Sequence, residues 1–170
     1  VVLDESAARR ELAARLAARG CVVADDADVD DWPCERAARH LLQRLDALAQ
    51  RHVGRPVAIV TTGELSVPLP PDPGVGGRNQ QFALHCAERI AGRPITVLSC
   101  GTDGVDGNSP AAGAVVDGQT AAKARARGLD PAAHLARCDA FPLLDAVGDA
   151  VVTGPTGTNV RDVRALVLAG

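Results

Sequence analysis

A glycine-rich turn at residues 74–77 runs directly into Arg78 and then into an apolar-periodic segment. Phe82, Cys86 and Ile90 recur every four residues, so they share one face of a predicted helix. Glycines before a helix let a ligand approach the backbone, and the first helical amides and the helix dipole favour an anion. Arg78 adds a planar, positively charged guanidinium group that can bind phosphate or carboxylate. The sequence therefore predicts an anion-binding turn; the alternative is a plain glycine-rich connection with a solvated arginine.

Two further loops carry groups suited to phosphoryl chemistry. Residues 101–108 follow the clearest buried strand of the chain and offer two carboxylates, Asp103 and Asp106. A carboxylate among phosphate-binding groups can hold Mg²⁺ or take a proton from an attacking hydroxyl. Residues 153–159 offer threonine hydroxyls and glycine amides, which suit an anion. Phosphoryl transfer needs this combination, although an ordinary turn is the alternative for each loop.

The elements that must position these loops alternate between strands and helices. Apolar runs predict strands at residues 1–3, 21–24, 57–60, 65–67, 95–100, 114–116, 150–152 and 163–168. Apolar periodicity predicts helices at 6–19, with Ser6 as N-cap, and at 34–52, 79–91, 119–127, 131–137 and 141–147. This alternation indicates a three-layer α/β fold with a largely parallel sheet and helices on both faces. Sites in open α/β sheets lie at the carboxyl ends of strands, so the three loops are expected at one sheet edge.

Composition narrows the class of protein. Residues 1–170 have the length of a single domain, and 46% apolar with 23% charged residues is typical of a globular protein. The net charge is -3, which predicts that nucleic acid is not a partner. The chain has no apolar run of bilayer length and no signal pattern, which predicts that it does not bind a membrane. Five cysteines without a C-x-x-C pair indicate reduced thiols in a cytoplasm. The absence of methionine indicates a processed chain or a piece of a longer protein.

Several well-known motifs are absent. The sequence contains no G-x-x-x-x-G-K-[ST] loop, and its one lysine is Lys123, in a predicted surface helix. The dinucleotide fingerprint fails because Asn79 stands where a third glycine or alanine is required, which counts against an NAD-dependent reductase. The four histidines lack metal spacing, and no serine lies in a G-x-S-x-G elbow.

Four segments together carry a family resemblance: Gly76-Gly77-Arg78-Asn79-Gln80, Gly101-Thr102-Asp103-Gly104-Val105-Asp106-Gly107, Ala112-Gly113-Ala114 and Thr153-Gly154-Pro155-Thr156-Gly157-Thr158-Asn159. They resemble the MOFRL family, the carboxy-terminal domain of class II glycerate 2-kinases, long labelled hydroxypyruvate reductases. The resemblance runs from the strand before Glu64 to the end of the chain. It extends more weakly through the first hundred residues, where it concerns the order of elements.

The resemblance implies an ATP- and Mg²⁺-dependent transfer of phosphate to the 2-hydroxyl of D-glycerate or a related hydroxy acid. It also implies a cleft shared with a larger amino-terminal domain, in the same or a partner chain, that supplies a lysine; a homodimer is compatible with it. Arg78 would bind phosphate or the substrate carboxylate, and Asp103 would be the base or the metal-side carboxylate. The implied substrate- and nucleotide-binding residues are Glu64, Gly76, Gly77, Asn79, Gln80, Thr102, Asp106, Gly154, Thr156, Gly157, Thr158 and Asn159.

The sequence also departs from the family pattern. Gly-Gly-Glu reads Thr62-Gly63-Glu64, the acidic residue usual after Asn-Gln is Gln81, the Asp usual before Ala-Ala-Gly is Pro110, and Asn-Asp-Ser reads Cys138-Asp139-Ala140. Losing an arginine-pairing carboxylate and several polar donors would retune the substrate or reduce activity. Two alternatives therefore stay open: a non-catalytic module that holds an anionic metabolite or a partner domain, and a hydroxypyruvate reductase.

Overall fold

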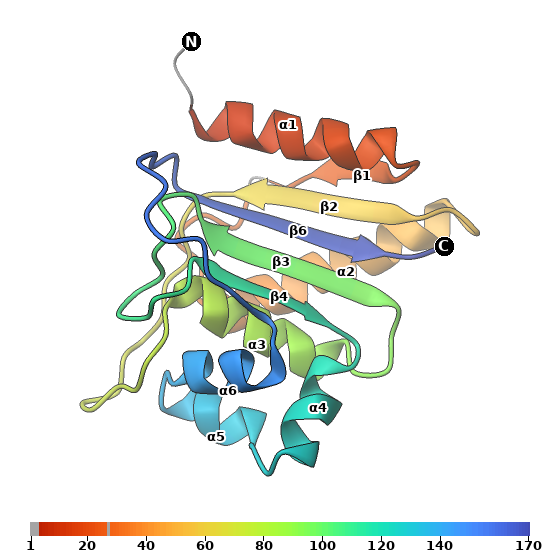
Figure 1. Cartoon of the computed structure of the whole chain (residues 1–170). Coiled ribbons are helices and arrows are strands. Elements are labelled where there is room, and N and C mark those ends of the chain that lie inside the picture. The colour runs from red at the N-terminus through yellow and green to blue at the C-terminus, as the bar shows by residue number, and fades with distance from the viewer. Residues whose placement is uncertain (1–3, 27) are drawn as a thin grey trace.

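Within residues 4–26 and 28–170, which the computed structural model describes, six strands form one sheet in the order β1-β2-β6-β3-β4-β5 (Figure 1). The strands are β1 (Val22–Asp25), β2 (Val57–Thr62), β3 (Ile95–Gly101), β4 (Gly113–Asp117), β5 (Ala150–Val151) and β6 (Asp162–Leu168). The strand predicted at residues 1–3 lies outside the described residues. The one predicted at 65–67 is reduced to an isolated bridge between Pro33 and Ser66.

The prediction of a largely parallel sheet is wrong. β1 and β2 are parallel, whereas the other neighbouring pairs of the described sheet are antiparallel. One cause is β6, which is last in chain order but lies between β2 and β3 and runs opposite to both. The other cause is residues 102–112, between β3 and β4, which contain no helix to carry a parallel crossover. β1, β2 and β3 still point the same way because helices connect them.

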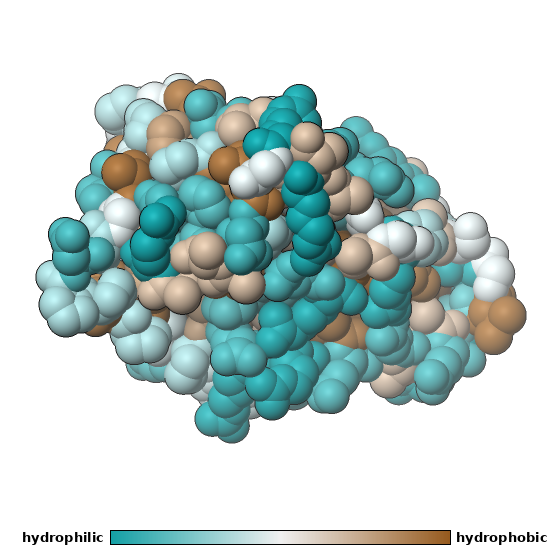
Figure 2. Space-filling model, turned by 90° about the horizontal axis from the view of Figure 1, so that it is seen from below, coloured by the Kyte–Doolittle hydropathy of each residue, from teal (hydrophilic) through white to brown (hydrophobic). Residues whose placement is uncertain are grey.

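Helices cover both faces of the sheet, as predicted. They are α1 (Glu5–Ala18), α2 (Cys34–Arg51), α3 (Arg78–Arg89), α4 (Thr120–Ala126), α5 (Pro131–Ala136) and α6 (Ala140–Val147). α1 packs on one face, against β1, β2 and β6. α2 and α3 pack on the other face, and α4, α5 and α6 form a further group against α3 (Figure 1). Seen from the side of that group, the surface is mainly hydrophilic (Figure 2).

The core is built mainly from Ala, Val, Leu and Ile side chains, and α3 lies at its centre. Phe82, Cys86 and Ile90 are fully buried, which confirms the shared helical face predicted from their spacing. The N-cap of α1 is Asp4 rather than Ser6, because the Asp4 carboxylate accepts the Ala7 amide at 2.7 Å. All five cysteines are free thiols. Among the described residues, no helix has both the length and the apolar character needed to cross a bilayer.

Candidate functional site

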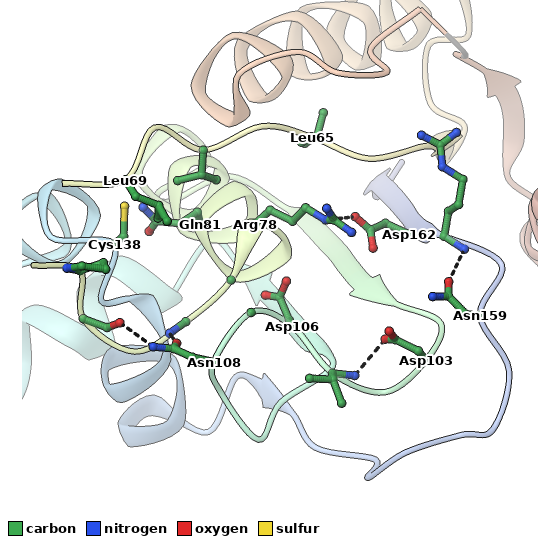
Figure 3. Close-up of a pocket in the computed structure, with 18 residues that line it drawn as sticks. Leu65, Leu69, Arg78, Gln81, Asp103, Asp106, Asn108, Cys138, Asn159 and Asp162 are labelled. Atoms are coloured by element: carbon green, nitrogen blue, oxygen red, sulfur yellow. Dashed lines mark hydrogen bonds and ion pairs between the residues drawn. The ribbon is translucent and has the colours of Figure 1, made fainter. Parts of the chain in front are cut away.

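The three glycine-bearing loops meet at one edge of the sheet. Because β6 is antiparallel to its neighbours, its start lies beside the carboxyl ends of β2 and β3: Val163 pairs with Thr62, and Asp162 with Gly101. A cavity of about 560 Å³ opens at this edge (Figure 3). Its polar lining comes from Arg78, Gln81, Asp103, Asp106, Asn108, Asn159, Arg161 and Asp162. Its apolar lining comes from Leu65, Val67, Leu69, Pro73, Val105 and Cys138.

Arg78 is the first residue of α3, and two carboxylates hold its guanidinium group at the cavity. Its Nε donates to Asp162 Oδ2 at 2.9 Å, and its Nη1 lies 3.0 Å from Glu64 Oε2. Burial lowers the pKa of Arg78, but the carboxylates of Asp162 and Glu64 outweigh burial and raise it above the ordinary value. The side chain is 38% exposed. Arg78 therefore presents a fixed, permanent positive charge to the cavity.

A second arginine, Arg164, lies fully buried in β6 behind this pair. Its Nη2 donates to Asp162 Oδ2 at 3.1 Å and its Nη1 to the Gly63 carbonyl at 2.9 Å. Burial lowers the pKa of Arg164, and the Asp162 carboxylate opposes that shift. One oxygen of Asp162 thus joins the buried arginine to the cavity arginine. Sequence analysis missed Asp162 and Arg164; the available signal was an arginine inside an otherwise apolar strand.

Asp106 caps the amino terminus of α3. Its carboxylate accepts the backbone amides of Asn79 at 3.1 Å and Gln80 at 2.9 Å, and the side-chain amides of the same two residues. Burial raises the pKa of Asp106, while these hydrogen bonds oppose the rise. The expectation of free amides at this helix start is wrong, because the protein supplies its own anion there. Asn79 and Gln80 point at Asp106 and do not line the cavity.

Gly77 leaves the space that Asp106 occupies, since a Cβ there would overlap the Asp106 carboxyl group and backbone. Replacing Gly77 with alanine is therefore expected to displace the cap and lower the free energy of unfolding by about 1–3 kcal/mol. Urea unfolding of the variant measures this loss. As a control, adding Gly77→Ala to Asp106→Ala should cost less but not nothing, because the overlap with the carboxyl group is gone while the overlap with the backbone of residue 106 remains; an equal cost in both backgrounds would contradict the displacement of the cap.

Two of the three threonines predicted to bind a ligand use their hydroxyl groups to connect two loops. Thr102 Oγ1 donates to the Arg161 carbonyl at 2.7 Å and accepts the Val160 amide at 2.8 Å. Thr156 Oγ1 donates to the Thr102 carbonyl at 2.6 Å. Of the residues implied by the resemblance, six line the cavity: Gly76, Gly77, Arg78, Asp103, Asp106 and Asn159. The others lie outside its lining: Glu64, Asn79, Gln80, Thr102, Gly154, Thr156, Gly157 and Thr158.

Asp103 is the cavity carboxylate that could take part in holding a metal ion. Among the described residues, no group of three or more His, Cys, Asp or Glu side chains can hold a metal ion. Mg²⁺ commonly keeps several waters and takes only one or two carboxylates besides substrate phosphates. Asp103 suits that role, because it lines the cavity and its Oδ1 accepts the Val105 amide at 3.1 Å, which leaves Oδ2 facing no protein donor among the hydrogen bonds of the described residues.

Residues 57–162, more than half of the chain, match the MOFRL family. This chain belongs to the MOFRL family. The D-glycerate 2-kinase of Thermotoga maritima is 42% identical over 114 residues, which cover 66% of this chain and 27% of that protein. A putative hydroxypyruvate reductase of Agrobacterium vitis is 44% identical over 115 residues, covering 66% of this chain and 30% of that protein. Human glycerate kinase is 39% identical over 158 residues, which cover 88% of this chain and 30% of that protein.

Solved structures extend the likeness of this MOFRL chain to almost its whole length. The crystal structure of a glycerate kinase from Thermotoga maritima superposes with a TM-score of 0.90 at 31% identity, covering 98% of this chain and 41% of that one. The crystal structure of a Pyrococcus horikoshii OT3 protein gives a TM-score of 0.90 at 29% identity, and the match covers 99% of this chain and 39% of that one. The chain therefore spans less than half the length of the relatives it matches.

Proposed function

We propose that this chain is the carboxy-terminal domain of an ATP-dependent glycerate 2-kinase, which phosphorylates the 2-hydroxyl of D-glycerate or a related hydroxy acid. The observation that carries the proposal is that Arg78, at the start of α3, and Asp103, in the loop after β3, line the same cavity of a MOFRL chain. The glycerate kinases among its relatives support the same reaction. The domain acts in the cytoplasm, where the free thiols of this chain stay reduced.

Each side chain has a role that its chemistry allows. The planar fork of Arg78 binds the substrate carboxylate or the oxygens of the transferred phosphoryl group, and Glu64 and Asp162 keep it in place. Asp103 accepts the proton of the 2-hydroxyl, or holds the metal ion that accompanies the nucleotide. ATP with Mg²⁺ supplies the phosphoryl group and neutralises part of its charge. Asp106 and Asp162 act indirectly, because their carboxylates hold the start of α3 and Arg78.

The site is completed by a second domain, in the same or a partner chain. This chain spans 27% of the Thermotoga maritima kinase that it resembles, which leaves room for a larger domain in such a protein. The one lysine of the sequence, Lys123, lies 3.8 Å from both Asp117 and Asp149 and does not line the cavity. Arg161 also lines the cavity, but its guanidinium group is paired with Glu5 and Asp30. The further cationic groups that phosphoryl transfer needs beyond Arg78 therefore come from that domain.

Replacing Asp103 with asparagine in the protein that carries this chain is expected to lower kcat with ATP and D-glycerate by about 10²–10⁴-fold, because asparagine accepts no proton. The KM for D-glycerate should change little. The measurement is the initial rate, with ³¹P NMR to assign the product as the 2-phosphate. Asp130→Asn is the matched control, since Asp130 caps α5 away from the cavity and asparagine caps equally well.

Other outcomes identify the competing functions. Binding of a phosphate-bearing ligand without turnover favours the non-catalytic module. A nicotinamide-dependent rate with hydroxypyruvate favours the reductase named for the Agrobacterium vitis relative. Either result, together with no transfer from ATP to glycerate, rejects the kinase.

A further inference from the structure

Two consecutive residues at the entry to β6 lie at the cavity, and they use their side chains differently. Asp162 accepts Nε of Arg78 directly, at 2.9 Å (Figure 3). Arg161 lines the same cavity, but its Nη1 donates to Glu5 Oε2 at 3.0 Å and its Nη2 to Asp30 Oδ1 at 2.7 Å. The proposed function gives Arg161 no part in the reaction.

Arg161 has a left-handed backbone conformation. Its φ is 66°, a value that residues other than glycine adopt only at a cost. Three hydrogen bonds hold it there: its amide donates to Asn159 Oδ1 at 3.0 Å, and its carbonyl accepts the Thr102 amide at 3.1 Å and the Thr102 hydroxyl at 2.7 Å. Strain that the surrounding structure maintains in this way is concentrated at functional sites, so a role in the site is expected for Arg161.

The Asp30 carboxylate connects Arg161 to the turn after β2. Its Oδ1 accepts both Arg161 Nη2, at 2.7 Å, and the Glu64 amide, at 2.8 Å. Burial raises the pKa of Asp30, but the hydrogen bonds from Arg161 and the Glu64 amide outweigh burial and lower it below the ordinary value. Gly63, with a φ of 94°, leaves room for this carboxylate, because a Cβ there would lie 2.7 Å from Asp30 Oδ1. Arg161 thus holds Asp30 against the backbone of Glu64.

The side chain of Glu64 extends this connection to the cavity arginine. Its Oε2 lies 3.0 Å from Arg78 Nη1, and the two side chains are 39% and 38% exposed. An ion pair with that much exposure is weak on its own, because water competes for both groups. Anchoring the Glu64 backbone reduces the conformational entropy that the pair loses when it forms. The orientation of Arg78 therefore depends on how firmly Asp30 holds Glu64.

We propose that Arg161 is a positioning residue, which holds the Arg78 guanidinium group in the orientation that binds the phosphoryl group or the substrate carboxylate. It acts through Asp30 and Glu64. This role rests on the proposed function, since it concerns the arginine that acts in phosphoryl transfer. Arg78 is then held from two sides, by Asp162 at Nε and by Glu64 at Nη1. Because half-exposed ion pairs add little to the free energy of unfolding, the loss of Arg161 affects the rate more than the stability.

The test is steady-state turnover with ATP and D-glycerate in the protein that carries this chain. Arg161→Met removes both ion pairs and is expected to lower kcat/KM for D-glycerate about 10-fold, since a small displacement of a binding group can cost up to about 10²-fold. Arg161→Lys, which can still pair with Asp30, should recover part of this loss. Arg93→Met is the matched control: Arg93 is 36% exposed, pairs with Asp46 and precedes β3 at the end of the strand away from the cavity.

The Arg78→Ala background separates positioning from a general disturbance of the loops. In that background Arg161→Met should lower kcat/KM by less than about 2-fold, because the group that Arg161 positions is already gone. A disturbed loop would instead lower the rate by the same factor in both backgrounds. That result, or a wild-type kcat/KM in Arg161→Met alone, would overturn the positioning role.

A readout without turnover distinguishes this role from the kinase itself. Exchange of the Arg78 Nε–H with water, followed by ¹⁵N NMR of the arginine side chains, should be several-fold faster in Arg161→Met than in the wild type. The signal is assigned by its loss in Arg78→Lys. Faster exchange in a protein that does not phosphorylate glycerate keeps the positioning role and rejects the kinase. Glycerate phosphorylation with an unchanged exchange rate keeps the kinase and rejects the positioning role.

Discussion

Replacing Arg78 with alanine is expected to lower kcat/KM for D-glycerate by about 10²–10³-fold, the usual loss when one fixed donor to developing charge is removed from a closed site. The expectation is large because Glu64 and Asp162 fix the guanidinium group before any ligand binds. No reorganisation is then required when the phosphoryl group moves. Steady-state rates with ATP and D-glycerate, measured on the protein that carries this chain, give the loss.

One further variant separates the effect of charge from that of geometry at Arg78, and another serves as its control. Arg78→Lys keeps the positive charge but cannot reach both carboxylates with a planar fork, so it should recover only part of the lost rate. Arg125→Ala is the matched control, because Arg125 is an exposed arginine of α4 that pairs with Glu88. Turnover that is unchanged in Arg78→Ala would mean that this arginine serves only to join Glu64 to Asp162.

Replacing Asp162 with alanine is expected to lower the free energy of unfolding by about 3–5 kcal/mol, the cost of leaving a buried charge without its partner. Arg164 is fully buried, and Asp162 is the carboxylate that accepts from it. Its remaining bond, to the Gly63 carbonyl, cannot neutralise the charge. Since the free energy of unfolding of a folded domain is about 5–15 kcal/mol, this single change would remove much of it. Urea unfolding followed by circular dichroism measures it.

The double variant Asp162→Ala/Arg164→Met tests the cause of that loss. With the buried charge also removed, more than half of the lost stability should return, because a buried pair can often be replaced by apolar groups at little cost. Asp145→Ala, on the exposed side of α6, should leave the unfolding midpoint unchanged. A loss below about 1 kcal/mol in Asp162→Ala would show that the Arg164 charge is compensated elsewhere.

Local patterns predicted the helices and strands well, because apolar spacing and turn residues act within a few residues of each other. The helix predicted at 79–91, for example, is observed at Arg78–Arg89. The direction of the strands was not predictable in this way, since the position of β6 between β2 and β3 depends on partners distant in the chain. The connection of β3 to β4 was the exception: residues 102–112 carry no helical signal, which favours an antiparallel pair.

The candidate site shows the same division. The glycine-rich turn, Arg78 and Asp103 stand out in the sequence, and their loops do meet at one sheet edge. The use of each polar group was hidden, because a carboxylate in a loop looks the same whether it faces a ligand or caps a helix. The Asp106 carboxylate caps α3 instead of facing a ligand. In the same way, the hydroxyl groups of Thr102 and Thr156 bind the backbone of neighbouring loops. Only the three-dimensional partners separate these roles.

The central place of β6 has a consequence for how the nascent protein reaches its native state. Thr62 pairs with Val163, so the middle of the sheet closes over most of the chain length. While the ribosome is still making the intervening residues, the facing sides of β2 and β3 have exposed backbone groups and no partner. Such distant pairing is slow to form, and unpaired edges invite aggregation. Biosynthesis of this fold should therefore depend on chaperones until residues 162–168 emerge.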